Sequence, residues 1–160
     1  MATATFSKVQ LSPSHAGAFH LPNISPASAE TASVMLQDNH EKNHIFFNAD
    51  HFHNHCVHHL LTLFALGASP EEIQKAYDAN KSYQLPRFPV EVETIEDMSD
   101  EAKFRTYLGQ EKFFHDYVVF FEKEIEKKGW QAVVNEYVFS RSENAELILT
   151  RMFGGTHFFR

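Results

Sequence analysis

Apolar residues recur at helical spacing through much of this sequence. The pattern is clearest between Gln110 and Lys128, where one apolar residue follows another every three or four positions and the run ends on Lys127-Lys128-Gly129. The stripe consists of Phe114, Tyr117, Val118, Phe121 and Ile125. We expect a helix over this segment, with the aromatic stripe as a core face and His115 beside it in a structural role.

Helix start signals divide the rest of the chain. Ser25-Pro26 predicts a cap and a first-turn proline for a helix to about Glu41, and Ser69-Pro70-Glu71-Glu72 predicts another to about Asn80. Ser99-Asp100-Glu101 opens a helix that Gly109 ends. Further helices are expected over about 130–139 and 144–153, whereas residues 85–96 are expected to form an extended connector or a short strand.

These elements predict an all-α protein. Residues 1–26 are rich in Ser, Thr, Ala and Pro and have no sustained period, so we expect an irregular N-terminal arm that lies on the body. Residues 27–160 are expected to form one multi-helix domain.

Five of the eleven histidines fall between Asp50 and Leu60. If a helix capped by Asn48 or Asp50 runs to Gly67, then His51, His55, His58 and His59 share one face and His53 points away from it. The opposite face carries Val57, Leu60, Leu61 and Phe64. The sequence therefore predicts an imidazole face backed by an apolar face.

This imidazole face is a candidate metal site. His55 is separated from His58 and from His59 by three and four residues, which lets two imidazoles reach one ion, so the candidate ligands are His55, His58 and His59. The alternatives are hydrogen-bonded structural histidines, a pH-sensitive surface or nonspecific metal binding. Further ligands would come from elsewhere in the protein, and the sequence does not rank them.

Composition narrows the function classes. A formal net charge of -7 argues against nucleic-acid binding and against a basic membrane-surface protein. No apolar run approaches the roughly 18 residues of a membrane span, and no signal peptide is evident, so a cytoplasmic protein is expected. The single cysteine, Cys56, excludes an internal disulfide and is expected to be a small core residue.

Common catalytic motifs are absent. The sequence contains no flavin or other nucleotide-binding glycine motif, no Gly-x-Ser-x-Gly elbow and no His-Glu-x-x-His zinc motif. A Cys56/His59 nucleophile pair is conceivable, but three residues apart on one helix they do not usually meet in the needed geometry.

The chain resembles the questin oxidase-like family of fungal oxidoreductases. Matching segments run from about Gln10 to Gly155 and include residues 44–48, 53–61, 65–70, 76–84 and 127–130, of which His-Asn-His-Cys-Val-His-His-Leu-Leu followed by Leu-Gly-Ala-Ser-Pro is the most specific. Members of the family are several hundred residues long. Where they continue through a His-Pro segment, this sequence departs at Gly155-Thr156-His157 and ends, so we expect an N-terminal portion of a larger, mostly helical protein.

The resemblance implies a Baeyer–Villiger-type monooxygenase. It implies oxygen-dependent oxidative ring cleavage of an anthraquinone-type, polycyclic aromatic polyketide in fungal secondary metabolism, with NADPH as reductant and non-haem iron as a possible centre. Neutral imidazoles suit Fe(II). His55 with either His58 or His59 would then be ligands, and the remaining histidine would orient them or the substrate. The alternative is a catalytically inactive helical segment that at most binds a metal or a partner.

Overall fold

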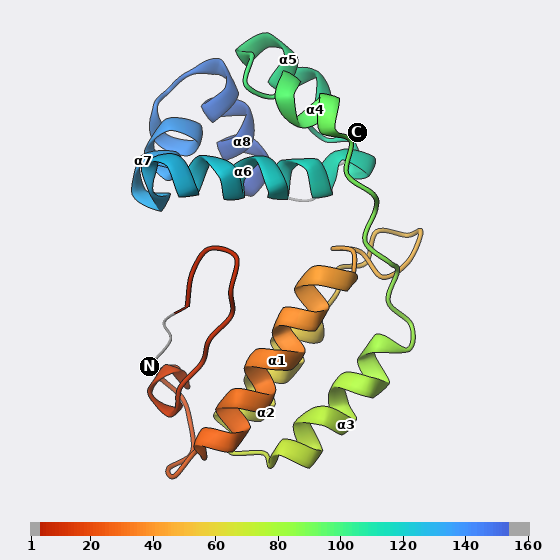
Figure 1. The fold of residues 1–160 in the computed structure, drawn as a ribbon, viewed down its shortest axis with the longest axis vertical. Coiled ribbons are helices and arrows are strands. Elements are labelled where there is room, and N and C mark those ends of the chain that lie inside the picture. The colour runs from red at the N-terminus through yellow and green to blue at the C-terminus, as the bar shows by residue number, and fades with distance from the viewer. Residues whose placement is uncertain (1–3, 154–160) are drawn as a thin grey trace. The chain divides into compact units, whose positions relative to one another are not determined.

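Helices account for most of the described chain. The computed structural model describes residues 4–153, and it contains no strand there: β-type contacts within this range are limited to isolated bridges such as Asn43–Pro86 and Phe46–His53 (Figure 1). The all-α fold class is thereby confirmed. Within the same range no helix is long and apolar enough to span a membrane.

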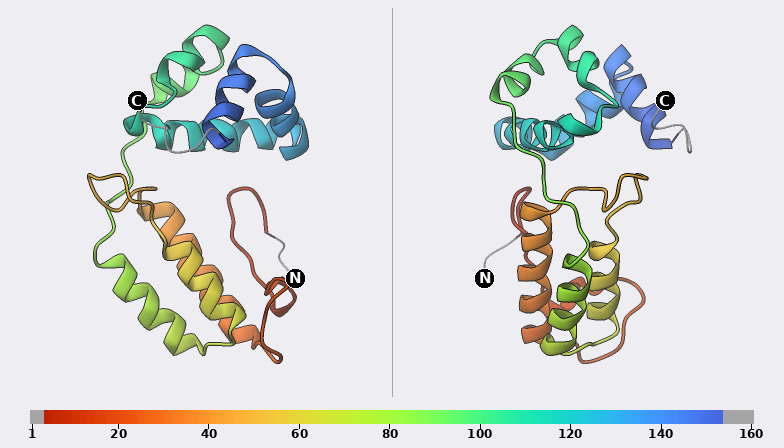
Figure 2. Two further views of the ribbon diagram at one scale, coloured as in Figure 1. Left: turned by 180° about the vertical axis from the view of Figure 1, so that it is seen from behind. Right: turned by 90° about the vertical axis from the view of Figure 1, so that its right-hand side faces the viewer.

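The chain divides into two compact units, Met1–Arg87 and Phe88–Arg160. The first contains α1 (Pro26–Lys42), α2 (Cys56–Ala65) and α3 (Pro70–Lys81), after a short 3₁₀ turn at Pro13–His15. These three helices pack against one another, and the right-hand view of Figure 2 shows them side by side. The expected division into an arm that ends at residue 26 and one helical domain stays a prediction.

Two of these helices begin where the capping residues of the sequence predicted. Ser25 accepts a hydrogen bond from the backbone N–H of Ser28 with Pro26 in the first turn, and Ser69 forms a reciprocal capping box with Glu72. The buried face of α1 is built largely of small residues, including Ala29 and Ala32, which allow a close approach of the neighbouring helices. The core of this unit lies between the three helices and includes Leu36, Cys56, Leu60, Phe64, Ile73 and Tyr77.

The N-terminal arm lies on α1. The backbone N–H of Val9 donates to Gln37 Oε1 at 2.8 Å, and the N–H of Leu11 donates to Ser33 Oγ at 2.8 Å. These contacts give the irregular segment partners for its backbone in place of water.

The second unit is built from shorter helices around an aromatic core. It contains α4 (Val92–Asp97), α5 (Glu101–Tyr107), a 3₁₀ turn (Glu111–Phe113), α6 (Phe114–Lys128), α7 (Trp130–Val134), a π-helical turn (Asn135–Phe139) and α8 (Glu143–Phe153). Phe104 is fully buried, and its ring contacts those of Tyr117, Phe120, Phe121 and Tyr137. Tyr117 and Phe121 of the expected core face pack on this cluster, but the buried aromatic residue of α6 is Phe120, which the expected face did not include.

The expectation for residues 85–96 is partly wrong. The segment before Val92 is extended, and it bonds to the end of α1 through His44 N–H to Leu85 O and Arg87 N–H to Lys42 O. Residues Val92–Asp97 are helical, because Ile95 and Met98, three residues apart, are both buried in the second core. The alternation of Val90 and Val92 suggested a strand, but this spacing of the buried residues follows the period of a helix.

Candidate functional site

The histidine run is not one helix. α2 begins only at Cys56, with His55 as its N-cap residue, and His51 has a left-handed backbone with φ of 61°. The predicted face of four histidines is therefore wrong, as are the predicted caps at Asn48 and Asp50. His55, His58 and His59 remain together at the start of α2, while His51 and His53 belong to the preceding loop.

A tight loop replaces the missing helical turns. Its two sides pair through Phe47 N–H to Phe52 O at 2.9 Å and Asn54 N–H to Ile45 O at 2.7 Å. The side chain of Asn54 completes the loop, since its Nδ2 donates to Asn39 Oδ1 and its Oδ1 accepts from the N–H of Cys56. Asn54 thus satisfies the first N–H of α2, and an asparagine two residues before the apolar run was the signal for the true helix start.

The buried face of α2 differs from the predicted one. Cys56, Leu60 and Phe64 are fully buried, whereas Val57 and Leu61 are each 38% exposed. At 100° per residue this face places His58 almost opposite the core, with His59 on one flank of the helix. His55, His58 and His59 are all exposed.

Two of the three candidate metal ligands lie in ring contact. The imidazoles of His55 and His58 are 5.6 Å apart between centroids, at an interplanar angle of 75°. Among residues 4–153 no group of three or more His, Cys, Asp or Glu side chains is arranged to hold a metal ion. The described residues therefore bring together a pair of imidazoles and not a complete ligand set.

His59 has different partners from its neighbours. Its Nδ1 lies 2.8 Å from Nδ2 of Asn80 on α3, and Asn80 Oδ1 accepts a hydrogen bond from the Tyr83 hydroxyl at 2.9 Å. Asn80 is only 7% exposed. Sequence reasoning missed Asn80 and Tyr83 as part of the site, because the packing of α2 against α3 brings them to His59.

Aromatic side chains surround the loop before α2. Phe46 is buried and its ring contacts those of His44, His51 and His53 at centroid distances of 5.1–5.7 Å. Phe47 stacks on Phe52 and meets the edge of Tyr83.

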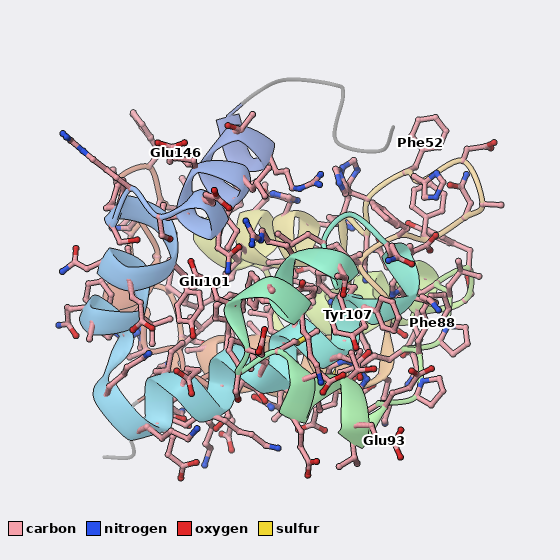
Figure 3. The ribbon with its side chains drawn as sticks, turned by 90° about the horizontal axis from the view of Figure 1, so that it is seen from above. Phe52, Phe88, Glu93, Glu101, Tyr107 and Glu146 are labelled. Atoms are coloured by element: carbon pink, nitrogen blue, oxygen red, sulfur yellow. The ribbon has the colours of Figure 1, made fainter. Side chains whose placement is uncertain are left out.

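The outer part of this aromatic group faces solvent. Phe52 and Tyr83 are 59% and 51% exposed, and the Phe52 ring projects outward from its loop (Figure 3). The backbone pairing of the loop fixes the position of Phe52, whereas Tyr83 follows α3 and contacts the loop through the Phe47 ring. Exposed apolar side chains that gather at one place often mark a binding site.

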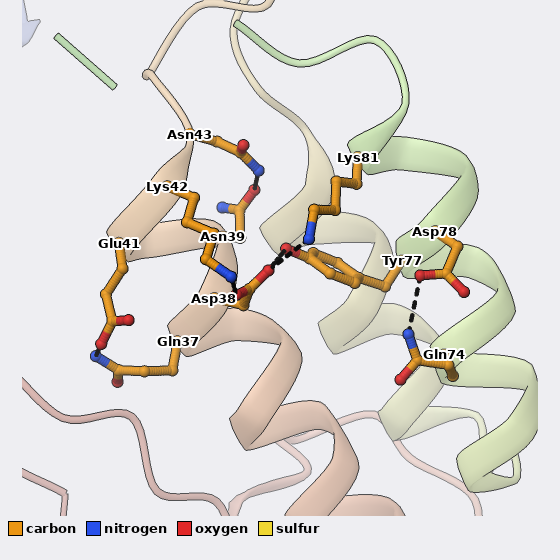
Figure 4. Close-up of polar contacts among 10 residues, drawn as sticks. All are labelled: Gln37, Asp38, Asn39, Glu41, Lys42, Asn43, Gln74, Tyr77, Asp78 and Lys81. Carbon is orange, nitrogen blue, oxygen red and sulfur yellow. Dashed lines mark hydrogen bonds and ion pairs between the residues drawn. The ribbon is translucent and has the colours of Figure 1, made fainter. Parts of the chain in front are cut away.

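A second polar cluster links α1 to α3. The Tyr77 hydroxyl donates to Asp38 Oδ2 at 2.5 Å, Lys81 Nζ lies 3.0 Å from the same oxygen, and Lys42 pairs with Oδ1 (Figure 4). Burial alone would raise the pKa of Asp38, but the hydrogen bonds from Lys42, Tyr77 and Lys81 outweigh it and hold that pKa well below its usual value. Burial, together with the hydrogen bond to the carboxylate, raises the pKa of the Tyr77 phenol.

Cys56 is a core residue. Its side chain is fully buried, and burial raises the pKa of its thiol to about 11. Because the thiolate is the nucleophile and the metal ligand, Cys56 is suited to neither role at neutral pH.

The second unit holds two polar residues at the start of α6. His115 Nδ1 lies 2.6 Å from the carbonyl of Phe88, which agrees with the structural role expected for it. Asp116 is fully buried and its Oδ1 accepts from the N–H of Glu91 at 2.6 Å. Both contacts hold residues 88–91 against α6. His157 lies outside the described residues.

Comparison with known proteins gives one family. The family model described as questin oxidase-like matches residues 52–157. The chain is 38% identical to the questin oxidase of Aspergillus terreus over 157 residues. The matched region covers 98% of this chain and 35% of that protein.

Other relatives have related names. The chain is 37% identical to the Baeyer-Villiger oxidase ptaJ of Pestalotiopsis fici, over 98% of this chain and 35% of that protein. It is 40% identical to the oxidoreductase AflY of Aspergillus parasiticus, over 95% of this chain and 31% of that protein. The chain therefore spans about a third of the length of the curated relatives it matches.

Proposed function

Because this chain belongs to the questin oxidase-like family, we propose that it is part of an oxidoreductase of fungal secondary metabolism. The proposed reaction is the oxygen-dependent oxidative ring cleavage of an anthraquinone-type polyketide. The observation that carries this proposal is the exposed imidazole group at the start of α2, beside an exposed aromatic surface and within the segment that the family model matches. Since the chain spans about a third of its relatives, its residues are assigned only a part of the site.

The proposed contribution of α2 is to hold a non-haem iron ion. With metal–nitrogen bonds of about 2.0–2.1 Å, the centroids of two imidazoles on one ion lie roughly 4.5–5.5 Å apart, depending on the bond angle. The 5.6 Å between the His55 and His58 rings is close to the upper end of this range. His59 is the third candidate. Bound iron would supply the redox chemistry with oxygen, and the open positions that oxygen and substrate need would remain, because two imidazoles fill only part of its coordination.

The exposed aromatic surface favours a flat, apolar substrate. Phe52 and Tyr83 present aromatic edges and faces to solvent, and Phe47 supports both from behind. Stacked and edge-to-face contacts with a fused ring system add to the burial of apolar area. NADPH as reductant remains part of this proposal, and no residue of this chain is assigned to it.

Iron binding tests the metal part of the proposal. The protein is titrated anaerobically with Fe(II), alongside the single variants His55→Ala, His58→Ala and His59→Ala and a control variant, His20→Ala, in the N-terminal arm. We expect the affinity to fall at least about tenfold when a ligand is lost, since even outer partners of a metal site have effects of this size. His20→Ala should leave it unchanged. Equal binding by all four variants would overturn the metal site.

Turnover tests the reaction itself. The protein is incubated with Fe(II), NADPH, oxygen and an anthraquinone such as questin, and mass spectrometry follows the gain of oxygen that accompanies ring cleavage. The alternative is a helical segment that at most binds metal or a partner without catalysis. Iron binding without product formation would favour this alternative for the chain taken alone, and product formation would exclude it.

A further inference from the structure

The amide orientation of Asn80 is determined by its neighbours. Its Nδ2 donates to the backbone carbonyl of Ala76 at 2.8 Å, and a carbonyl can only accept. Its Oδ1 accepts from the Tyr83 hydroxyl at 2.9 Å. Reversing the amide would place two acceptor oxygens against each other at Ala76, in a side chain that is almost fully buried and unable to turn to water instead.

This orientation determines the tautomer of His59. An amide nitrogen carries two hydrogens, and the second is directed to the Nδ1 of His59 at 2.8 Å. Nδ1 therefore accepts, and in the neutral ring the proton is on Nε2. The histidine is exposed, so this N–H is accessible to a ligand.

Other histidines of the chain are held in the opposite tautomer. Nδ1 of His115 lies 2.6 Å from the carbonyl of Phe88, and Nδ1 of His20 lies 2.8 Å from the carbonyl of Gly17. Because both partners can only accept, these two rings carry their proton on Nδ1. These two rings therefore serve as internal references for the Nδ1–H tautomer.

We propose that Asn80 is a positioning residue that holds His59 as a hydrogen-bond donor, through Nε2–H, to an acceptor atom of the bound ligand. A nitrogen that carries a proton has no lone pair for a metal, so His55 and His58 are the imidazoles left for the ion. The ligand class is a carbonyl-bearing aromatic, such as a quinone, whose oxygen accepts from His59. The role toward substrate rests on the proposed function, whereas the tautomer does not.

Nuclear magnetic resonance of the histidine side chains tests the tautomer directly. In the ¹⁵N-labelled, metal-free protein above pH 8, long-range ¹H–¹⁵N correlation distinguishes a protonated ring nitrogen from an unprotonated one. We expect His59 to show an unprotonated Nδ1 and a protonated Nε2, and His115 to show the reverse. His59→Gln identifies the His59 signals by their loss. A proton on Nδ1 of His59 would overturn the proposal.

Variants at Asn80 and Tyr83 separate positioning from folding. In Asn80→Asp the carboxylate can only accept, so the His59 proton should move to Nδ1, while the His20 signals report on the fold of the same unit. Tyr83→Phe leaves the amide bonded to Ala76 and should leave the His59 pattern unchanged. An unchanged His59 pattern in Asn80→Asp would contradict the role of Asn80.

Iron affinity distinguishes this inference from the proposed function. His59→Gln keeps an N–H donor and should bind Fe(II) within about twofold of the parent chain, whereas His58→Gln should lose at least about tenfold. Equal losses in both variants would make His59 a ligand and overturn the inference while leaving the metal site in place. If neither variant loses affinity, the metal site fails, and the tautomer result still decides the role of Asn80.

Discussion

Two polar clusters share α3 and differ in how they end: the Asp38 cluster joins α3 to α1, and the His59 cluster joins it to α2. In the Asp38 cluster the carboxylate accepts from Lys42, Tyr77 and Lys81, so both of its oxygens are used within the protein. In the His59 cluster the hydrogen bonds run from Tyr83 through Asn80 to an exposed imidazole. The first cluster is closed, and the second ends in a group that can bind something else.

This difference separates a structural role from a functional one. A strongly shifted pKa often marks a functional site, but Asp38 owes its shift to partners that hold α1 against α3. The His59 cluster contributes fewer charge interactions and leaves a donor at the surface. We therefore expect the closed cluster to control stability and the open cluster to control binding.

The largest expected difference is between two matched tyrosines. Tyr77→Phe removes a hydrogen bond to a carboxylate from a side chain that is 2% exposed, and should lower the free energy of unfolding by about 1.5–3 kcal/mol. Tyr83→Phe removes a bond between neutral groups at a half-exposed ring, and should lower it by about 0.5 kcal/mol. Urea unfolding followed by circular dichroism measures both, and equal effects would contradict the comparison.

A smaller effect is expected from pH. The pKa of Asp38 is lower in the folded chain than its unfolded value of about 4, so its contribution is complete above that pH and is lost as the pH falls. Between pH 7 and pH 3 this loss amounts to about 1 kcal/mol. Asp38→Asn should lack this part of the acid destabilisation.

Asp78 provides the matched control for the pH prediction. It is an exposed carboxylate on α3 that accepts from Gln74. Asp78→Asn should therefore leave the difference in unfolding free energy between pH 7 and pH 3 close to that of the parent chain. If Asp38→Asn behaves like Asp78→Asn, the linkage to Asp38 is refuted.

Elements with local signals were predictable from the sequence. The start of α3 depends only on neighbouring residues. Its capping box forms between Ser69 and Glu72, three positions apart, with Pro70 at the first helical position. The histidine helix failed because its first turns compete with a loop in which Asn54 binds Asn39, fifteen residues away. The helical spacing of residues within the run gives no information on a contact with a residue fifteen positions away.

The candidate site was only half predictable for the same reason. Spacing along one helix identified His55, His58 and His59 together, and it could not distinguish His58 from His59. The distinction comes from Asn80, which is 21 residues beyond His59 and meets it through helix packing. The tautomer of a histidine depends on such a partner and has no signature in the run itself.

The smallest expected effect on stability is that of removing Lys81, the exposed member of the Asp38 cluster. Lys81 pairs with Asp38 at 3.0 Å, but its side chain is 45% exposed, and exposed ion pairs contribute only about 0.2–1 kcal/mol. Lys81→Met should therefore lower the free energy of unfolding by about 0.5 kcal/mol, and by less at 1 M salt, where screening weakens the pair. Lys75→Met, at an exposed position of the same helix, controls for the change in net charge and helix propensity. If Lys81→Met costs as much as Tyr77→Phe, then the cluster depends on its surface charge and not on its buried hydrogen bond.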